Sequence, residues 1–180
     1  MNITETKLPG LLLIDPKVFG DERGYFFESY NEKIFRDAGL DLHFVQDNES
    51  MSGKGVLRGM HFQHPPYAQG KLVRVVRGAV LDVSVDIRRS SSTFGKWLSF
   101  ELSENNKRML WIPPGFAHGF LTLEENTLFQ YKCTGFYNRQ AEGIIRWNDP
   151  DLNIEWGVDD PVVSEKDSKA PLFKDLKSKF

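Results

Sequence analysis

The stretch RGMHFQHPP, residues 58–66, places two histidines three positions apart, at His61 and His64. Imidazole side chains at such a spacing can ligate a metal ion or transfer a proton. In a β-strand, residues two apart share a face and residues three apart do not, so both rings reach one site only if the strand is broken. Pro65 and Pro66 cannot continue a hydrogen-bonded ladder. We therefore expect the strand to end here, with His61 facing inward and His64 at the rim.

A metal centre needs more ligands than this stretch offers. The later stretch PGFAH ends at His118 and resembles the second histidine motif of cupin barrels. Where such barrels usually place a carboxylate ligand, this sequence has Lys71, whose charge repels a metal ion. His61 and His118 alone supply fewer ligands than zinc or iron sites use. We therefore predict no metal, and we assign His61 as a base.

A catalytic base needs an orienting carboxylate, a proton donor and a cation for developing negative charge. Lys71 can supply the cation, although a solvated strand end explains a lysine equally well. Tyr131 shares a strand face with Phe129 and Cys133, which fits a proton donor or an ordinary core tyrosine. Asp167 can orient the base or simply add charge to the first turn of a helix. From the residues alone these alternatives stay open.

The bulk properties of the chain narrow the classes of function. The 180 residues are 40% hydrophobic, which predicts one globular domain over residues 1–180. The 23 basic and 25 acidic residues nearly balance, so we expect neither nucleic acid nor an anionic membrane as a partner. The single cysteine, Cys133, fits a reducing compartment. The apolar run Leu11–Ile14 is too short for a signal peptide or a membrane span, and we expect a cytoplasmic protein.

Strand signals dominate the elements that must position these residues. The stretch 71–87 contains two apolar runs separated at Arg77-Gly78, which predicts a hairpin. In its second run Leu81, Val83, Val85 and Ile87 share one face, and Asp82, Ser84 and Asp86 share the other. Many short strands with Gly and Pro between them predict an all-β sandwich or barrel. The other expected strands are 25–30, 55–63, 97–102, 108–112, 119–123, 127–134 and 143–146. We also expect two short helices, one over residues 31–38 that is capped by Asn31 and one that starts at Ser164.

Long stretches of the sequence resemble one family of enzymes. These are PKVFGDERGYFFESYN, FVQDNESMS, the stretch 55–97 from GVLRGMHFQHPP to TFGKW, WIPPGFAHGFLTL, YKCTGFY and IRWNDPDLNIEW. They resemble the dTDP-4-dehydrorhamnose 3,5-epimerase family from about residue 7 to residue 171. One departure is Gly135, where family members tend to have an aspartate; it lies outside the matched site residues.

The resemblance implies a cupin-type jelly roll without a metal or other cofactor, assembled as a homodimer. The expected substrate is dTDP-4-dehydro-6-deoxy-D-glucose and the product dTDP-4-dehydro-L-rhamnose, in dTDP-L-rhamnose biosynthesis. The family's base maps to the His61–Asp167 pair and its proton donor to Tyr131, and Lys71 is our candidate to stabilise the enolate. The implied substrate-binding residues are Arg23, Glu28, Gln46, Asn48, Arg58, Lys71, His118, Glu142 and Lys166.

Three other functions remain open at this stage. A sister epimerase that inverts only carbon 5 or carbon 3 can share the same catalytic set. A metal-dependent cupin is disfavoured by Lys71, and a non-catalytic sugar-nucleotide-binding cupin is disfavoured by an intact catalytic set. Phe19 and Phe26 are both candidates to stack on the thymine base. For the dimer, we expect the segment 25–30 to cross between subunits and cover an open sheet edge.

Overall fold

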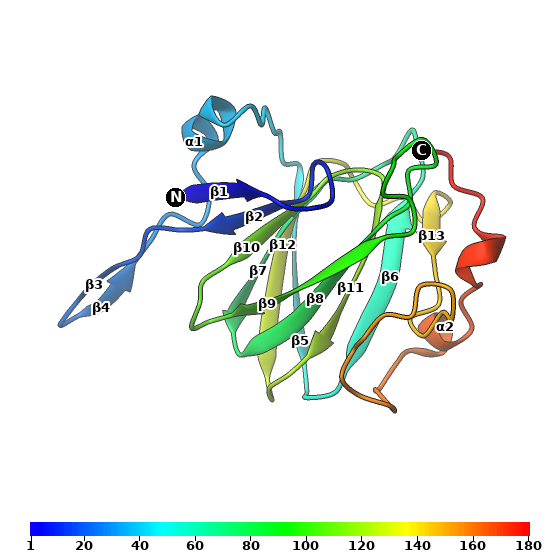
Figure 1. Cartoon of the computed structure of the whole chain (residues 1–180). Coiled ribbons are helices and arrows are strands. Elements are labelled where there is room, and N and C mark those ends of the chain that lie inside the picture. The colour runs from blue at the N-terminus through cyan, green and yellow to red at the C-terminus, as the bar shows by residue number, and fades with distance from the viewer.

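The computed structural model describes residues 1–180, and most of its regular structure is antiparallel sheet (Figure 1). Two sheets pack face to face, as the predicted all-β, cupin-type jelly roll requires, so that prediction is confirmed. The first sheet contains, in spatial order, β1 (Asn2–Glu5), β2 (Leu12–Asp15), β10 (Met109–Ile112), β7 (Lys71–Arg77), β12 (Thr127–Cys133) and β5 (Gln46–Ser52). The second contains β13 (Glu142–Ile144), β6 (Leu57–Gln63), β11 (Phe116–Thr122), β8 (Ala79–Asp86) and β9 (Trp97–Ser103).

The space between the sheets holds the central apolar core. Val73 and Phe129 of the first sheet meet Val80 and Phe120 of the second, and all four side chains are buried. The ring centroids of Phe120 and Phe129 lie 4.1 Å apart in a stacked arrangement. This core fills one part of the interior, and the remaining part is lined by polar side chains.

Part of the outer face of each sheet is also covered, so the central strands are buried on both sides. Val83 and Val85 of β8 pack under Trp156 and the rest of the C-terminal segment, which runs along the outside of β6 (Figure 1). On the first sheet, Trp111 packs under Phe35 of α1 (Glu32–Asp37). The alternation of β8 therefore does not separate core from solvent, since its apolar face lies under the C-terminal segment and its polar face points between the sheets.

The predicted helices form with the predicted caps. Asn31 Oδ1 accepts a hydrogen bond from the Ile34 N–H at the start of α1. Ser164 Oγ accepts one from the Asp167 N–H at the start of α2 (Glu165–Ser168). Both contacts satisfy amide groups that a helix N-terminus leaves free. None of the helices is long and apolar enough to cross a membrane.

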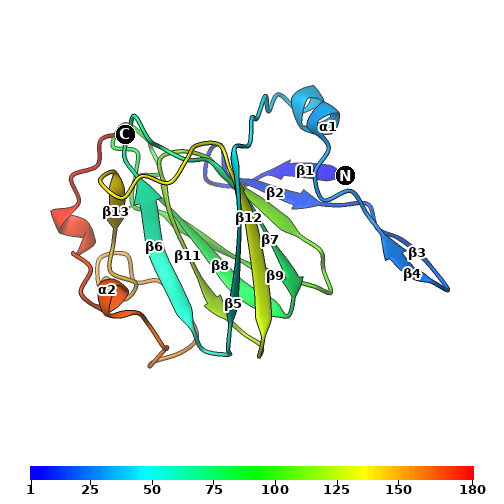
Figure 2. The same ribbon diagram turned by 180° about the vertical axis from the view of Figure 1, so that it is seen from behind.

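A two-stranded hairpin, β3 (Phe19–Asp21) and β4 (Gly24–Phe26), extends away from both sheets (Figures 1 and 2). The predicted strand 25–30 is wrong beyond Phe26, because the chain leaves the hairpin there and turns toward α1. Strand β11 starts three residues earlier than predicted, at Phe116 instead of residue 119. Strands β1, β2, β3 and β5 were not predicted.

Strands β6 and β11 approach unusually closely next to His61. A Cβ atom on Gly59 would lie 2.5 Å from the Cα of Gly119, so neither position tolerates a side chain without movement of a strand. Gly59 also has a φ of +143°, which L-residues rarely adopt. The two glycines thereby fix the spacing of the strands that carry His61 and His118.

Candidate active site

A cavity of about 560 Å³ opens between the two sheets, next to the central core. Its walls come from β5, β6, β7, β11, β12 and the segment that leads into α2. A smaller hollow adjoins it and shares Asn48, His61, Lys71 and Tyr131 with it. The predicted site residues on these walls are His61, Lys71, Tyr131, Asp167, Asn48, Arg58, His118 and Lys166 in the main cavity, and Gln46 and Glu142 in the smaller one.

His61 and Asp167 form a hydrogen-bonded pair although they lie far apart in the sequence. His61 Nε2 is 2.8 Å from Asp167 Oδ1, and the Gly59 N–H donates to Asp167 Oδ2 over 3.3 Å. Burial raises the pKa of Asp167, but the bonds from His61, Gly59 and Ser164 outweigh it and bring the pKa below the usual value. The ionised carboxylate therefore holds a proton on Nε2 and leaves the Nδ1 lone pair of neutral His61 as the basic position.

A second histidine–aspartate pair lies beside the first. His118 of β11 sits directly opposite His61 in the strand register, and its Nε2 is 2.8 Å from Asp82 Oδ2 of β8. Asp82 is completely buried, and its other oxygen has no hydrogen-bond partner. The sequence analysis assigns a role to His118 and none to Asp82. The sequence does contain a signal for Asp82, because it is a carboxylate between apolar neighbours in a strand, where burial of an unpaired charge costs free energy.

Lys71 and Tyr131 project from the opposite wall, on β7 and β12 of the first sheet. The Lys71 Nζ lies 5.7 Å from the centroid of the Tyr131 ring, and neither polar group has a protein partner for a hydrogen bond or ion pair. Burial lowers the pKa of Lys71, an effect that nearby Asp82 and Glu142 partly oppose. Burial raises the pKa of Tyr131, so its phenol keeps its proton at neutral pH. Both groups are thus available to a bound molecule.

Polar and charged groups surround these two walls. Lys166 and Glu142 form an ion pair of 2.5 Å, and the Tyr137 hydroxyl lies 3.3 Å from Glu142 Oε2. Arg58 keeps most of its guanidinium free, since only its Nε donates within the protein, to Ser52. The sequence analysis assigned no site role to Tyr137. The signal that could have indicated one is a tyrosine in a loop beside charged residues, and the structure leaves this side chain exposed.

Comparisons with known proteins agree with one another on a family. The family model described as dTDP-4-dehydrorhamnose 3,5-epimerase matches residues 5–175. The chain belongs to this family. It is 56% identical to the dTDP-4-dehydrorhamnose 3,5-epimerase of Shigella flexneri, over 97% of each chain. The predicted resemblance is therefore confirmed, and the chain is an epimerase.

Solved structures of family members share the fold over nearly the whole chain. The crystal structure of the enzyme from Elizabethkingia anophelis matches with a TM-score of 0.93 and 51% identity, over 97% of each chain. A dTDP-6-deoxy-D-glucose-3,5-epimerase from Legionella pneumophila, solved with dTDP-4-keto-L-rhamnose, matches with a TM-score of 0.93 and 48% identity, over 97% of this chain and 94% of that one.

Two of the predicted substrate-binding residues of this epimerase lie away from its cavity. Arg23 sits at the tip of the extended hairpin, where its side chain pairs with Asp21 and is 84% exposed. Glu28 accepts a hydrogen bond from Asn31 at the start of α1. The structure of one chain therefore does not bring Arg23 and Glu28 together with the other predicted residues.

His64 also lies outside the cavity, as predicted for a residue beyond the strand end. It follows the last residue of β6, and its ring packs edge-on against Phe62 with centroids 5.0 Å apart. Burial, with a smaller contribution from Lys179, lowers its pKa and favours the neutral ring. No group of three or more His, Cys, Asp and Glu side chains converges in a geometry that could hold a metal ion.

Proposed function

We propose that this epimerase converts dTDP-4-dehydro-6-deoxy-D-glucose to dTDP-4-dehydro-L-rhamnose by inverting carbons 3 and 5, as a step toward dTDP-L-rhamnose. The ketone at carbon 4 acidifies the hydrogens on both neighbouring carbons. Inversion at either carbon requires removal of a proton from one face and its return to the other. The observation that carries the proposal is the placement of His61 and Tyr131 on opposing sheets, facing one another across the cavity.

His61 is the base in this mechanism. Neutral His61 takes the proton from carbon at Nδ1, and Asp167 stabilises the resulting imidazolium through the bond to Nε2. The electron pair of the broken C–H bond moves onto the ketone oxygen and forms an enolate. Because Asp167 is ionised and buried, its attraction to the imidazolium is stronger than it would be in water.

Lys71 stabilises the enolate and Tyr131 completes the inversion. The Lys71 ammonium has no carboxylate partner within ion-pair distance, so its charge is free to meet the developing oxyanion. The Tyr131 phenol then donates its proton to carbon from the other wall. The phenolate and the imidazolium return to their starting states by proton exchange with solvent, so no cofactor is consumed.

The remaining polar groups are suited to the nucleotide part of the substrate. Arg58 can present a fork of donors to a diphosphate oxygen, and Lys166 adds a second cation. Tyr137 offers an exposed ring at the edge of the smaller hollow, beside Glu142 and Gln46. We therefore place the sugar between the two sheets and the nucleoside toward Tyr137.

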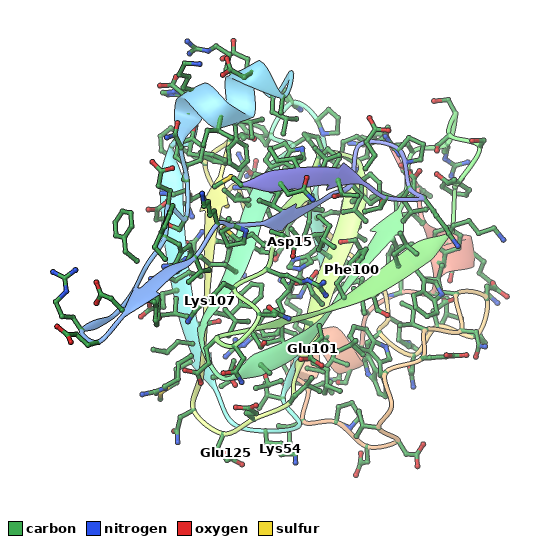
Figure 3. All side chains as sticks on the ribbon, turned by 60° about the vertical axis from the view of Figure 1, so that its left-hand side comes forward. Asp15, Lys54, Phe100, Glu101, Lys107 and Glu125 are labelled. Carbon is green, nitrogen blue, oxygen red and sulfur yellow. The ribbon has the colours of Figure 1, made fainter.

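A homodimer explains where Arg23 acts. The hairpin leaves Phe19, Tyr25 and Phe26 more than half exposed, at 53%, 60% and 66%, which is unusual for aromatic side chains of a monomer. Lys107 Nζ lies 3.8 Å from the centroid of the Tyr25 ring and contacts the hairpin from the body of the protein. Figure 3 shows Lys107 on the side of the molecule from which the hairpin extends. In a two-fold dimer each hairpin reaches the other subunit, and it brings Arg23 to that cavity.

The single cysteine supports a cytoplasmic location. Cys133 is free and buried. A free thiol of this kind fits a reducing compartment, so we place the enzyme in the cytoplasm.

Deuterium uptake tests the proposed function. The protein is incubated with dTDP-4-dehydro-6-deoxy-D-glucose in heavy water, and mass spectrometry and NMR locate the incorporated deuterium. We expect deuterium at carbons 3 and 5 and formation of the L-sugar. Deuterium at one carbon only would identify a single-centre epimerase, and binding without any uptake would refute catalysis.

A further inference from the structure

The carboxylate of the catalytic pair sits on an element that is too small to hold its own position. Asp167 belongs to α2, a helix of four residues, and isolated helices of that length are not stable in water. Before the helix, the Val162 N–H donates to Gly55 O over 2.8 Å and Val162 O accepts from the Leu57 N–H over 2.9 Å, which anchors the chain to the base of β6. The chain after the helix needs an anchor of its own.

One short segment, residues 142–149, contacts both the strand that carries His61 and the chain that follows α2. Its first part is β13, which pairs with β6 so that Ile144 lies directly opposite His61. Ile145 and Met60 then exchange two backbone hydrogen bonds, of 3.0 and 3.1 Å. The segment is therefore held in a fixed register to the strand that carries His61, and both ribbon views show β13 between β6 and the C-terminal chain (Figures 1 and 2).

The residues that follow β13 bind the chain just beyond α2. The Arg146 N–H donates to Pro171 O and its Nε donates to Ala170 O, each over 2.9 Å. The Arg146 guanidinium forms no ion pair with a carboxylate, and Ala170 O is its hydrogen-bond partner in the protein. Burial of Ala170, which is 2% exposed, makes the accepted bond hard to replace with water.

Asp149 adds a second hydrogen bond between the segment 142–149 and the C-terminal chain. Its carboxylate is 1% exposed, and its Oδ2 accepts the Phe173 N–H over 2.6 Å. Its Oδ1 accepts the N–H groups of Asp151 and Leu152, which closes a local turn. The turn accounts for one oxygen of Asp149, and the bond to Phe173 ties the turn to the C-terminal chain.

We propose that Arg146, supported by Asp149, is a positioning residue for catalysis, which sets the distance between Asp167 and His61. This inference rests on the proposed function, since it assigns the two residues to the His61–Asp167 pair. The segment 142–149 acts as a spacer with one end on the strand of His61 and the other on the chain that leaves α2. Displacement of a catalytic group by about 1 Å can lower a rate about 100-fold, so such a spacer affects turnover directly.

The first experiment compares Arg146→Met with Arg146→Lys and a matched control. Arg146→Met keeps an apolar stem and removes the bond to Ala170, and we expect kcat to fall about 10- to 100-fold with KM changed less than about 2-fold. Arg146→Lys keeps one donor and should recover a measurable part of the loss. The control is Arg89→Met, which removes a similar bond from an arginine to Leu176 O of the same C-terminal segment, far from α2. We expect its kcat to stay within about 2-fold of wild type.

The second experiment asks whether Arg146 acts through Asp167. Arg146→Met is placed in the Asp167→Asn background, and turnover is measured by deuterium uptake. A positioning role predicts little further loss, because the group being positioned is already disabled. Losses that multiply in the double variant, or an Arg146→Met whose kcat loss equals its loss of folded protein in thermal melts, would overturn the inference.

Asp149→Asn gives an independent check. An asparagine can keep the turn through its Oδ1 but loses the acceptor for the Phe173 N–H, so we expect the same fall in kcat with KM preserved. Wild-type protein in the same assay separates the two claims. Absence of uptake in wild type would refute the proposed function, whereas normal uptake in wild type and in both variants would refute only the positioning role.

Discussion

At the scale of single residues, the proposed mechanism assigns proton removal to one wall of the cavity, and charge stabilisation and proton return to the other. His61 and His118 each contact a buried aspartate, so the second sheet together with α2 contributes two imidazole–carboxylate pairs to the interior. Lys71 and Tyr131 have no such partners, which leaves their polar groups free. The two walls therefore differ in chemistry as well as in position.

The pKa directions of Lys71 and Tyr131 predict an alkaline limit on turnover. Burial lowers the pKa of Lys71, so the ammonium loses its proton at a lower pH than an exposed lysine, whereas burial raises the pKa of the Tyr131 phenol. We expect kcat to fall as pH rises through the lowered pKa of Lys71. In a pH–rate profile, Lys71→Arg should move this alkaline decrease in kcat to higher pH. A decrease that stays at the same pH would show that another group titrates. Lys71→Met should lower kcat about 10²- to 10³-fold.

Tyr131→Phe separates proton removal from inversion. The variant keeps the ring but loses the donor, so His61 can still remove and return a proton on its own face. We expect continued exchange of substrate hydrogen with heavy water and a loss of L-sugar of about 10²-fold or more, measured by NMR on the same sample. Equal loss of exchange and inversion would argue against a donor role.

At the scale of elements, polar faces of strands are used inside the molecule. Asp82, Ser84 and Asp86 lie on the inner face of β8 and are fully buried. Asp82 forms a hydrogen bond with His118 at the cavity, whereas Asp86 accepts hydrogen bonds from the loop that follows the strand. Asp86 accepts hydrogen bonds from Arg88, Ser91 and Thr93, and these fix the turn between β8 and β9.

Asp86 makes part of the stability of the protein dependent on pH. Burial raises its pKa, but the bonds from Arg88, Ser91 and Thr93 outweigh this and lower the pKa to about 2. A pKa below the unfolded value of about 3.9 stabilises the folded state above that pH, and this contribution is lost as pH falls toward 2. We expect Asp86→Asn to lower the free energy of unfolding by ~2–4 kcal/mol at pH 7, measured by urea denaturation, and by less near pH 2. An equal loss at both pH values would contradict this assignment.

Gly119→Ala tests the close approach of β6 and β11. Its Cβ would lie 2.7 Å from Met60 Sδ and 2.8 Å from Arg58 O, so the strands must separate. We expect a loss of stability of ~1–3 kcal/mol, because overpacking in a close-packed interior forces backbone movement. Turnover of the folded fraction should also fall, since His61 and His118 lie on the displaced strands. Gly20→Ala, also in a strand and without a positive φ, is the control, since its Cβ would make only an ordinary contact of 3.7 Å with Gly24 O.

At the scale of the whole molecule, the predicted site residues do not all gather at the cavity of one chain. Ten of the predicted residues line the cavity or its adjoining hollow, and Arg23 and Glu28 do not. The extended hairpin with its exposed aromatic side chains is the feature that a second copy explains. The proposed exchange of hairpins therefore links assembly to activity.

Mixing two inactive variants tests this exchange. Arg23→Ala lacks the hairpin cation and His61→Ala lacks the base, so each homodimer should be impaired. If each hairpin serves the partner's cavity, a mixed dimer has one intact site, and a re-equilibrated 1:1 mixture should recover about 25% of wild-type activity. If Arg23 acts in its own chain, no mixed dimer has an intact site and activity does not recover. Sedimentation analysis provides the oligomeric state of each sample.

The sequence by itself determined the fold class, the two short helices and most of the longer strands, because those depend on local spacing, capping residues and turn residues. It missed β1, β2, β3 and β5. In β5, Asn48 and Ser50 are half-buried while Asp47 and Glu49 are exposed, and a strand that is polar on both faces has no apolar alternation. The family resemblance implied the His61–Asp167 pair, and the structure gives its geometry. The tertiary structure alone joined Asp82 to His118 and Arg146 to the chain beyond α2. Such pairs are separated by long stretches of chain, and only the register of the strands and the packing of the C-terminal segment bring them within hydrogen-bonding distance.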